Sequence, residues 1–140
     1  MSGMYLSGLK ALTDGTVAWG TADTRCALVT SSYTFAETHD FVSNLTNELS
    51  GGNYARVALT SETITEVGAS HYNKYTAANC TFSALAAAAG TPAYAIIYVY
   101  NADDGAAQLL ACVTLTTPPT PNGGDYTLTW ASGIVFTIGN

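Results

Sequence analysis

The chain has 140 residues, of which 48% are hydrophobic and only 10% are charged, and its net charge is −6. This length fits one domain whose core is large enough to fold without disulfides or metal, and the low charge excludes a disordered chain. The four basic residues, Lys10, Arg25, Arg56 and Lys74, are scattered, whereas a nucleic-acid interface needs clustered lysine and arginine. The composition therefore indicates a folded acidic domain that binds no nucleic acid.

The first residues are expected to form an arm. Within residues 1–13, Tyr5, Leu6 and Leu9 lie among glycines, without the pattern of a strand or a long helix. Such a segment predicts a flexible N-terminal arm that orders only on binding. We expect the remaining residues, 14–140, to form a single β domain, because no linker divides them.

One short helix is predicted between the first strands. Strand-like sequence begins at residues 16–19 and returns at 24–31, where β-branched and apolar residues dominate. Apolar residues then recur at helical spacing, from a possible N-cap at Thr38 to the glycine pair 51–52. The pattern predicts a helix over residues 38–49, the exception in an otherwise β-rich chain.

The rest of the chain alternates between short strands and turn signals. Residues 93–100 (AYAIIYVY) are the most apolar run, and because both alternating sets of side chains are large or apolar, both faces of this strand should be covered. Residues 84–89 are rich in alanine and can form a helical turn, and 117–124 form a proline-rich connector. The further predicted strands cover residues 54–60, 62–67, 79–84, 109–116, 126–130 and 134–138.

These elements define the fold class. Seven or eight short strands, separated by turn signals every 8–12 residues or so, are typical of a β-sandwich or barrel. We therefore expect a mainly β protein: a single-domain antiparallel sandwich or barrel with one short helix near 38–49.

No residue pattern points to catalysis, a metal or a cofactor. His39 and His71 each stand near one candidate partner only, and the acid pair at 103–104 lacks the ligand spacing of a calcium loop. The three cysteines are far apart and form no CxxC pair, which favours reduced thiols over a bridge between Cys26 and Cys112. We expect no enzyme activity, no catalytic residues and no cofactor.

A membrane span is not expected either. Residues 75–102 carry no charge, but polar residues and the Gly90-Thr91-Pro92 turn interrupt them, whereas a span needs about 20 predominantly apolar residues. The first residues lack a basic stretch followed by an apolar one, so no signal peptide is apparent.

The charge is distributed unevenly along the chain. Residues 1–70 carry ten charged side chains, whereas residues 71–140 carry only Lys74, Asp103, Asp104 and Asp125. A C-terminal half with so few charges suggests that another subunit covers part of its surface. The alternative is a surface of threonine, serine, asparagine and tyrosine, which solvates a β-protein without charge. Nine tyrosines fit an interface as well as a core, because tyrosine combines apolar area with a hydroxyl.

Several segments together resemble a family of small structural proteins of tailed bacteriophages. They are 25–30 (RCALVT), 33–35 (YTF), 39–41 (HDF), 52–60 (GNYARVALT), 79–82 (NCTF), 95–98 (AIIY), the 104–105 turn (DG), 120–130 (TPNGGDYTLTW) and 133–134 (GI). In this order they span residues 24–138, which is nearly the whole chain, and the alanine-rich stretch at 84–89 departs from the family. The resemblance implies a structural role in the virion and no catalytic residues.

Our first hypothesis is a capsid decoration (cement) protein that stabilises the head by binding capsid subunits. Its partners would be the major capsid protein or other virion proteins, and further copies of itself, with a trimer favoured. Because no signal peptide is apparent, we expect assembly in the host cytoplasm and residence in the virion. The predicted interface residues are Tyr5, Leu6, Leu9, Tyr94, Tyr98, Tyr100, Pro118, Pro119 and Pro121.

Two alternatives remain open at the level of sequence. The chain could be a tail, neck or fibre component of the same kind of virion. It could also be a carbohydrate-binding module for host attachment, which an exposed Trp19 or Trp130 flanked by acids would favour.

Overall fold

The computed structural model describes residues 3–139 as a mainly β protein built from antiparallel sheets, which confirms the predicted fold class. Its one α-helix in this range is α1 (Leu6–Thr13), and short 3₁₀ helices cover Val42–Asn44, Gly68–Ser70, Ala87–Ala89 and Ala131–Gly133. The strands are β1 (Gly3–Met4), β2 (Thr24–Val29), β3 (Val57–Ala58), β4 (Thr63–Val67), β5 (Tyr72–Thr76), β6 (Cys80–Phe82), β7 (Tyr94–Val99), β8 (Leu109–Thr114), β9 (Tyr126–Leu128) and β10 (Ile134–Gly139).

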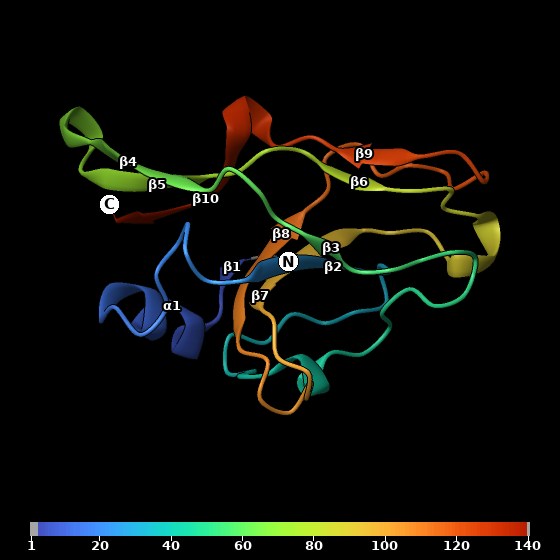
Figure 1. Cartoon of the computed structure of the whole chain (residues 1–140), viewed down its shortest axis with the longest axis horizontal. Helices are drawn as coiled ribbons and strands as arrows, with labels where there is room; N and C mark the ends of the chain where they lie inside the picture. The colour runs from blue at the N-terminus through green and yellow to red at the C-terminus, as the bar shows by residue number, and fades with distance from the viewer. Residues whose placement is uncertain (1–2, 140) are drawn as a thin grey trace.

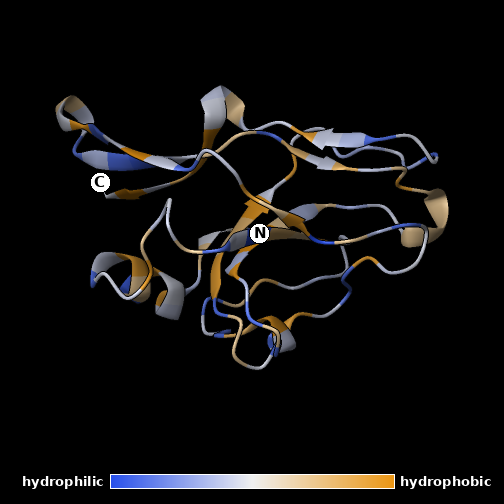
Figure 2. Ribbon diagram, viewed as in Figure 1, coloured by the Kyte–Doolittle hydropathy of each residue, from blue (hydrophilic) through white to orange (hydrophobic). Residues whose placement is uncertain are grey.

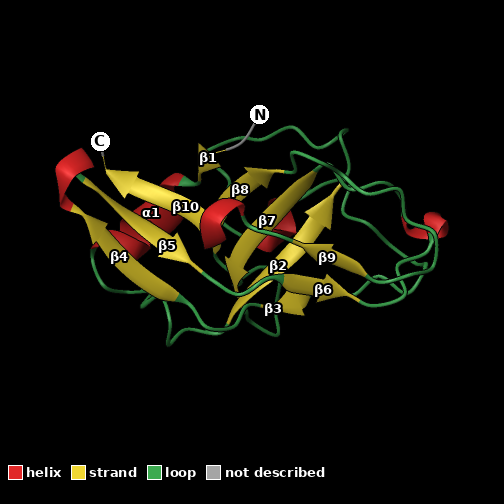
Figure 3. Cartoon of the chain, turned by 90° about the horizontal axis from the view of Figure 1, so that it is seen from above, coloured by secondary structure: helices red, strands yellow, loops and turns green. Residues whose placement is uncertain are grey.

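A five-stranded sheet, in the order β1-β8-β7-β2-β3, forms the centre of the molecule (Figure 3). Strand β7 lies in the middle, where Ile97 is opposite Cys26 of β2 and Ile96 is opposite Cys112 of β8. The hydrophobic colour in Figure 2 follows these central strands. Because neighbouring side chains of β7 point to opposite faces, both faces of this strand must be covered.

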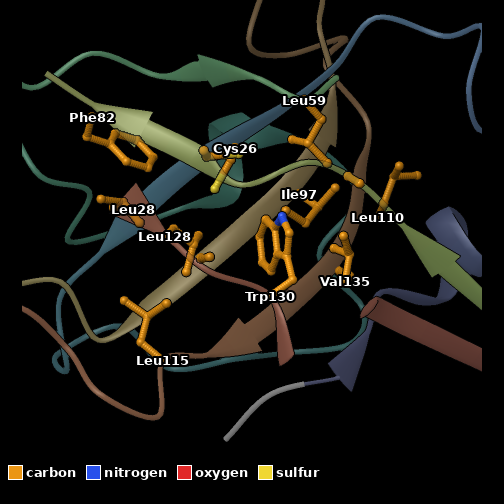
Figure 4. Close-up of a cluster of buried hydrophobic side chains, with 14 of the residues drawn as sticks. Cys26, Leu28, Leu59, Phe82, Ile97, Leu110, Leu115, Leu128, Trp130 and Val135 are labelled. Carbon is orange, nitrogen blue, oxygen red and sulfur yellow. The ribbon is translucent and has the colours of Figure 1, made fainter. Parts of the chain in front are cut away.

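Two smaller sheets cover one face. Sheet β6-β9 and sheet β10-β5-β4 lie next to each other on the same side of the central sheet (Figure 1). The larger hydrophobic cluster fills the space between the layers, and Figure 4 shows Leu28 and Ile97 of the central sheet close to Trp130, Leu128 and Phe82 of the covering layer. The arrangement is that of a sandwich, as the sequence predicted.

The opposite face is covered by irregular chain and by the N-terminal segment. A second cluster there includes Ile96 and Tyr98 of β7, together with Tyr5, Tyr33 and Val42. Both sets of side chains on β7 are therefore buried, which confirms the prediction that the strand is covered on both faces.

The predicted flexible arm is folded in the structure. Within the described residues 3–13, β1 pairs with β8 and α1 packs beside it. Tyr5 is completely buried, and its hydroxyl lies 2.8 Å from that of Tyr33. Burial raises the pKa of the Tyr5 hydroxyl above its usual range, so this hydroxyl stays protonated. A polar group buried with a partner fixes the segment in place.

The predicted helix over residues 38–49 is wrong. Only Val42–Asn44 form a single 3₁₀ turn, although Val42 and Leu49 are buried as their spacing suggested. Backbone hydrogen bonds lead away from a helix: the amide of Val42 donates to the carbonyl of Ala107, and that of Leu49 donates to the carbonyl of Leu28. Asn47 has a φ of 60°, which an α-helix cannot accommodate. Contacts with distant strands therefore override the local preference.

The strand expected from residues 16–19 is also absent. These residues form a loop that places Trp19 against the three-stranded sheet β10-β5-β4. There its indole N–H donates to the carbonyl of Thr76 at 3.1 Å. The alanine-rich stretch does form a short turn, the 3₁₀ helix Ala87–Ala89.

Replacing Gly8 tests how closely α1 lies against β8. A Cβ atom at this position would overlap the carbonyl oxygen of Leu109 and lie 2.7 Å from the Cα of Leu110. We expect Gly8→Ala to lower the free energy of unfolding by about 1–3 kcal/mol, in spite of alanine's better helix propensity, because backbone atoms cannot move aside. Urea denaturation would measure the change. Gly68→Ala is the matched control, since its Cβ would meet Oε1 of Glu66 at an ordinary 3.6 Å, and equal stabilities would contradict the packing.

Truncating Ile97 tests the central position of β7. Ile97 is fully buried, so Ile97→Ala should lower the free energy of unfolding by about 2–5 kcal/mol through lost apolar contact and a cavity. Ile64→Ala on β4 is the control, because Ile64 is 49% exposed and should cost no more than about 0.5 kcal/mol. A similar loss for the two variants, measured in dilute protein by urea denaturation, would refute this assignment of the core.

Candidate functional site

The structure does not bring the nine predicted interface residues together. Tyr5, Tyr98 and Pro121 are buried in the folded chain, so in this conformation their side chains are not accessible to a partner, and their role in an interface stays a prediction. Strand β7 has a hydrogen-bonded neighbour along both edges, which leaves it no edge for a partner. The remaining six residues divide into the half-buried Leu9, Tyr94 and Pro119 and the exposed Leu6, Tyr100 and Pro118.

The exposed members come from separate segments. Leu6 is 50% exposed at the start of α1, whereas Pro118 lies in the connector between β8 and β9. Tyr100 follows β7, and the guanidinium carbon of Arg25 lies 3.7 Å from its ring centroid. The ring of Tyr100 therefore already makes a cation–π contact within the chain.

The most exposed regular structure is the sheet β10-β5-β4. In β4, the four residues from Thr63 to Glu66 are all exposed, although successive side chains point to opposite faces. Ile64 is 49% exposed, one of the few large apolar side chains in the described chain that face water. Strand β4 is thus uncovered on both faces, and Figure 3 shows it at the outer side of the sheet. We take this strand as the candidate interaction site.

Aromatic packing anchors the sheet that carries this site. The ring of Trp19 meets those of Tyr75 and Phe136 edge-on, with ring centroids 5.8 and 5.1 Å away, and the latter two rings stack at 4.7 Å. Register explains the cluster, because Tyr75 is paired with Phe136 of β10 and with Ile64 of β4. Ile64 therefore extends an anchored aromatic row toward the free side of the sheet.

Sequence reasoning predicted β4 as a strand but missed its exposure. Its alternating sequence, TITEV, reads as a half-buried strand, and the partner β5 was not predicted because its sequence, YNKYT, contains few apolar residues. The available signal was the density of polar residues on two successive segments, 63–67 and 72–76. Two adjacent strands with so little apolar surface cannot both be core strands.

A cavity of about 290 Å³ lies between the end of β8 and β9. Its walls combine apolar side chains, such as Leu115 and Ile134, with the threonines at 114, 116 and 127. The one ionisable side chain in this lining is that of Tyr126, and burial raises its pKa to about 12. The cavity thus offers apolar contact and neutral hydroxyl groups.

An ion cluster ties two loops together beneath β7. The guanidinium of Arg56 binds the carboxylate of Glu48 at 2.7 Å and that of Asp104 at 2.8 Å. Its central carbon lies 5.5 Å from the ring centroid of Tyr98. The charge of Arg56, through its hydrogen bonds, holds the pKa of the Asp104 carboxyl below its usual range. Asp104, in the turn between β7 and β8, therefore has a partner within the chain.

The remaining chemistry-bearing side chains lie apart or buried. All three cysteines are buried thiols that form no disulfide, and burial raises the pKa of the Cys112 thiol to about 12. The ring of His39 contacts the hydroxyl of Tyr33 at 3.4 Å, and His71 lies at the turn between β4 and β5. Among residues 3–139, no three histidine, cysteine or acidic side chains are grouped so that they could hold a metal ion. No helix in the same range is long and apolar enough to cross a membrane.

Neither tryptophan forms an exposed platform. Trp19 is 7% exposed and Trp130 is 4% exposed. The indole N–H of Trp130 donates to the carbonyl of Ala78 at 3.0 Å. The feature that would have favoured a carbohydrate-binding module is therefore not present at these two residues.

Comparisons of the chain with protein-family models, with curated proteins and with solved structures found no match.

The pair formed by Arg56 and Asp104 predicts a dependence of stability on pH. A carboxyl whose pKa is lower in the folded than in the unfolded chain stabilises the fold above its unfolded pKa of about 3.9, and this contribution is lost as the pH falls. Because the side chain of Asp104 is 46% exposed, we expect it to be worth only about 0.5 kcal/mol. Asp104→Asn should lower the free energy of unfolding by about 0.5 kcal/mol at pH 7, and by less below a pH of about 3.

Urea denaturation between these pH values would measure the effect. The same substitution in an Arg56→Gln background is the control, since it should have little further effect once the cation is gone. A full effect in that background would show that Arg56 is not the partner.

Proposed function

We propose that this chain is a structural protein of a tailed-bacteriophage virion, and specifically a decoration protein that binds capsid subunits and stabilises the head. The single observation that carries the proposal is the anchored sheet β10-β5-β4, whose outer strand β4 is uncovered on both faces. The resemblance of segments across residues 24–138 to small virion proteins supports the same role.

The mechanism is mechanical: the protein adds buried area between neighbouring subunits. A strand edge supplies backbone N–H and C=O groups, which bind another extended segment by hydrogen bonds along its length. Each contact can be modest, because a shell repeats it many times and a subunit held at one point binds its next contact at high effective concentration.

The low charge of the C-terminal half fits this role. Much of its exposed surface is threonine, serine or asparagine, with Thr81, Thr127 and Thr129 on exposed positions of β6 and the β9 segment. Neutral hydroxyl groups are less costly to remove from water than charges, so such a surface can be covered by a neighbour at low cost. A protein that packs between subunits benefits from this property.

Quantitative mass spectrometry on purified virions, with heads and tails separated, tests the proposal. Decoration predicts a copy number comparable to that of the major capsid protein in the head fraction, because a decorator binds at every repeat of the shell. The major capsid protein and a known tail protein of the same virion serve as internal standards.

Removing the protein then tests its mechanism. Heads that lack it should release their contents at a lower temperature than complete heads, and adding the purified chain should restore the original value. A few copies located in the tail fraction would replace decoration by a tail or neck role, and absence from the virion would refute the proposal altogether.

A further inference from the structure

We propose that β4 pairs edge to edge, antiparallel, with β4 of a second copy of this chain, about a two-fold axis that passes beside Thr65. The inference concerns the isolated chain in solution, so it goes beyond the proposed virion role and does not depend on it. It gives this edge a partner in the absence of other virion proteins, which a capsid segment bound at the same edge would have to replace, and it gives the register of the pairing.

The first argument is that β4 has an unpaired edge with little of the usual protection. In the sheet order β10-β5-β4, strand β4 is terminal, and no other strand within residues 3–139 pairs with it. Edge strands of natural proteins are normally blunted by charged side chains, above all lysine, by proline or by a bulge. The five residues of β4 (TITEV) include one charged residue, Glu66, and neither proline nor lysine, and their register with β5 runs without a shift from Thr63 to Val67. The edge is therefore ready to accept a further strand.

The other end of the same sheet is different. Strand β10 lies beside β1 and β8, and the three strands line a common cavity of about 220 Å³ through residues such as Met4, Val113 and Phe136. Its pairing with β5 also contains an irregularity between Ile134 and Phe136. An incoming strand would meet the chain's own β1 and β8 there. Pairing of β4 with β10 of a neighbour is thus disfavoured, so of the pairings between the two ends of this sheet β4 with β4 is favoured, an isologous contact.

Charge and side-chain direction select one register. A two-fold axis perpendicular to the sheet turns β4 of one copy onto β4 of the other without exchanging the two faces of the sheet. Residues directly opposite each other must therefore have side chains that point to the same face. Centring the pair on Ile64 would place Glu62 opposite Glu66, and centring it on Glu66 would place that acid opposite itself. Like charges directly opposite each other are destabilising. Centring on Thr65 avoids both conflicts and pairs all five residues of β4.

The selected register also explains the exposed apolar side chain. It places Ile64 opposite Glu66 of the second copy, and Thr63 opposite Val67. Ile64 would then be covered by the aliphatic part of the facing glutamate, and the anchored aromatic row of Tyr75 and Phe136 would continue beneath a six-stranded sheet. Five residues of edge cover less than the roughly 800 Å² per partner of a standard interface, so the dimer should be weak and depend on concentration.

Sedimentation equilibrium of the whole chain, from about 10 μM to about 1 mM, tests the association. We expect a reversible monomer–dimer equilibrium with a Kd between about 10 μM and about 1 mM. Thr65→Glu places two glutamates opposite each other at the axis, while within the chain the new acid faces Lys74 of β5, and it should weaken the dimer at least about tenfold. Thr127→Glu, at an exposed threonine in the middle of β9, is the matched control and should leave the association unchanged.

Cysteine cross-linking tests the register. Residues directly opposite each other in such a pair have Cβ atoms about 4.5–5.5 Å apart, close to the distance that a disulfide requires. Thr65→Cys should therefore give a covalent dimer when oxidised glutathione is added. Thr63→Cys on the same strand should not, because it faces Val67 rather than its own copy.

Each outcome of these experiments either supports or overturns the inference. A chain that remains monomeric up to about 1 mM would overturn the inference. So would a dimer or trimer that Thr65→Glu leaves intact, because another surface would then hold it. Cross-linking of Thr63→Cys as efficient as that of Thr65→Cys would overturn the register. Because these measurements need no virion, a result that contradicts the β4 dimer can be told apart from a result that contradicts the decoration role.

Discussion

Burial of both faces of the central strands is the constraint on which the rest of this structure depends. Strands β2, β7 and β8 carry apolar side chains in both alternating positions, so a single covering layer cannot remove them from water. One face is covered by the two smaller sheets. The other is covered by the N-terminal segment and by the long irregular stretch before β3, in which Tyr5 and Tyr33 share a hydrogen bond. Segments that have little regular structure of their own therefore pack on this face, because the hydrophobic effect favours removing its apolar side chains from water.

This constraint also explains where exposed structure can occur. A chain of 140 residues has few elements left once both faces of its central sheet are covered. The sheet β10-β5-β4 is anchored by the ring contacts of Trp19 with Tyr75 and Phe136, and its far strand extends beyond the covered region. The protein thus combines a core that is closed on both sides with one strand that is open on both sides. Such a division suits a subunit whose own fold is complete and whose contacts with neighbours are made through backbone.

The sequence predicted best those features that a local pattern determines. Alternation in residues 93–100 identified β7 and its two buried faces, because a central strand carries apolar residues in every position. Spacing also placed Val42 and Leu49 in the core, but it could not reveal that their backbone amides bind Ala107 and Leu28 from other parts of the chain. The helix was therefore predicted where a loop is found.

The candidate site was less accessible to prediction for a related reason. The sequence predicted an interface at tyrosine-rich and apolar segments. Their apolar character reflects the core, however, and Tyr98 is almost completely buried. Exposure depends on which strands neighbour one another, and the partner β5 gave no clear periodic signal. A polar strand is recognised as an exposed edge only when the order of the strands in its sheet is known.

Pairing between distant parts of the chain has a consequence for the biosynthesis of this protein. Gly3 of β1 is paired with Cys112, and Tyr75 of β5 is paired with Phe136. The central sheet cannot be completed before β8 has been made, at Thr114, and the sheet of β4 cannot be completed before β10 has been made, at Gly139. Contacts of such long sequence separation form slowly, and the apolar strand β2 is synthesised well before its neighbour β7 in the sheet. The nascent chain must therefore carry an unshielded hydrophobic strand for part of its translation, a stage at which a molecular chaperone would raise the yield of folded protein.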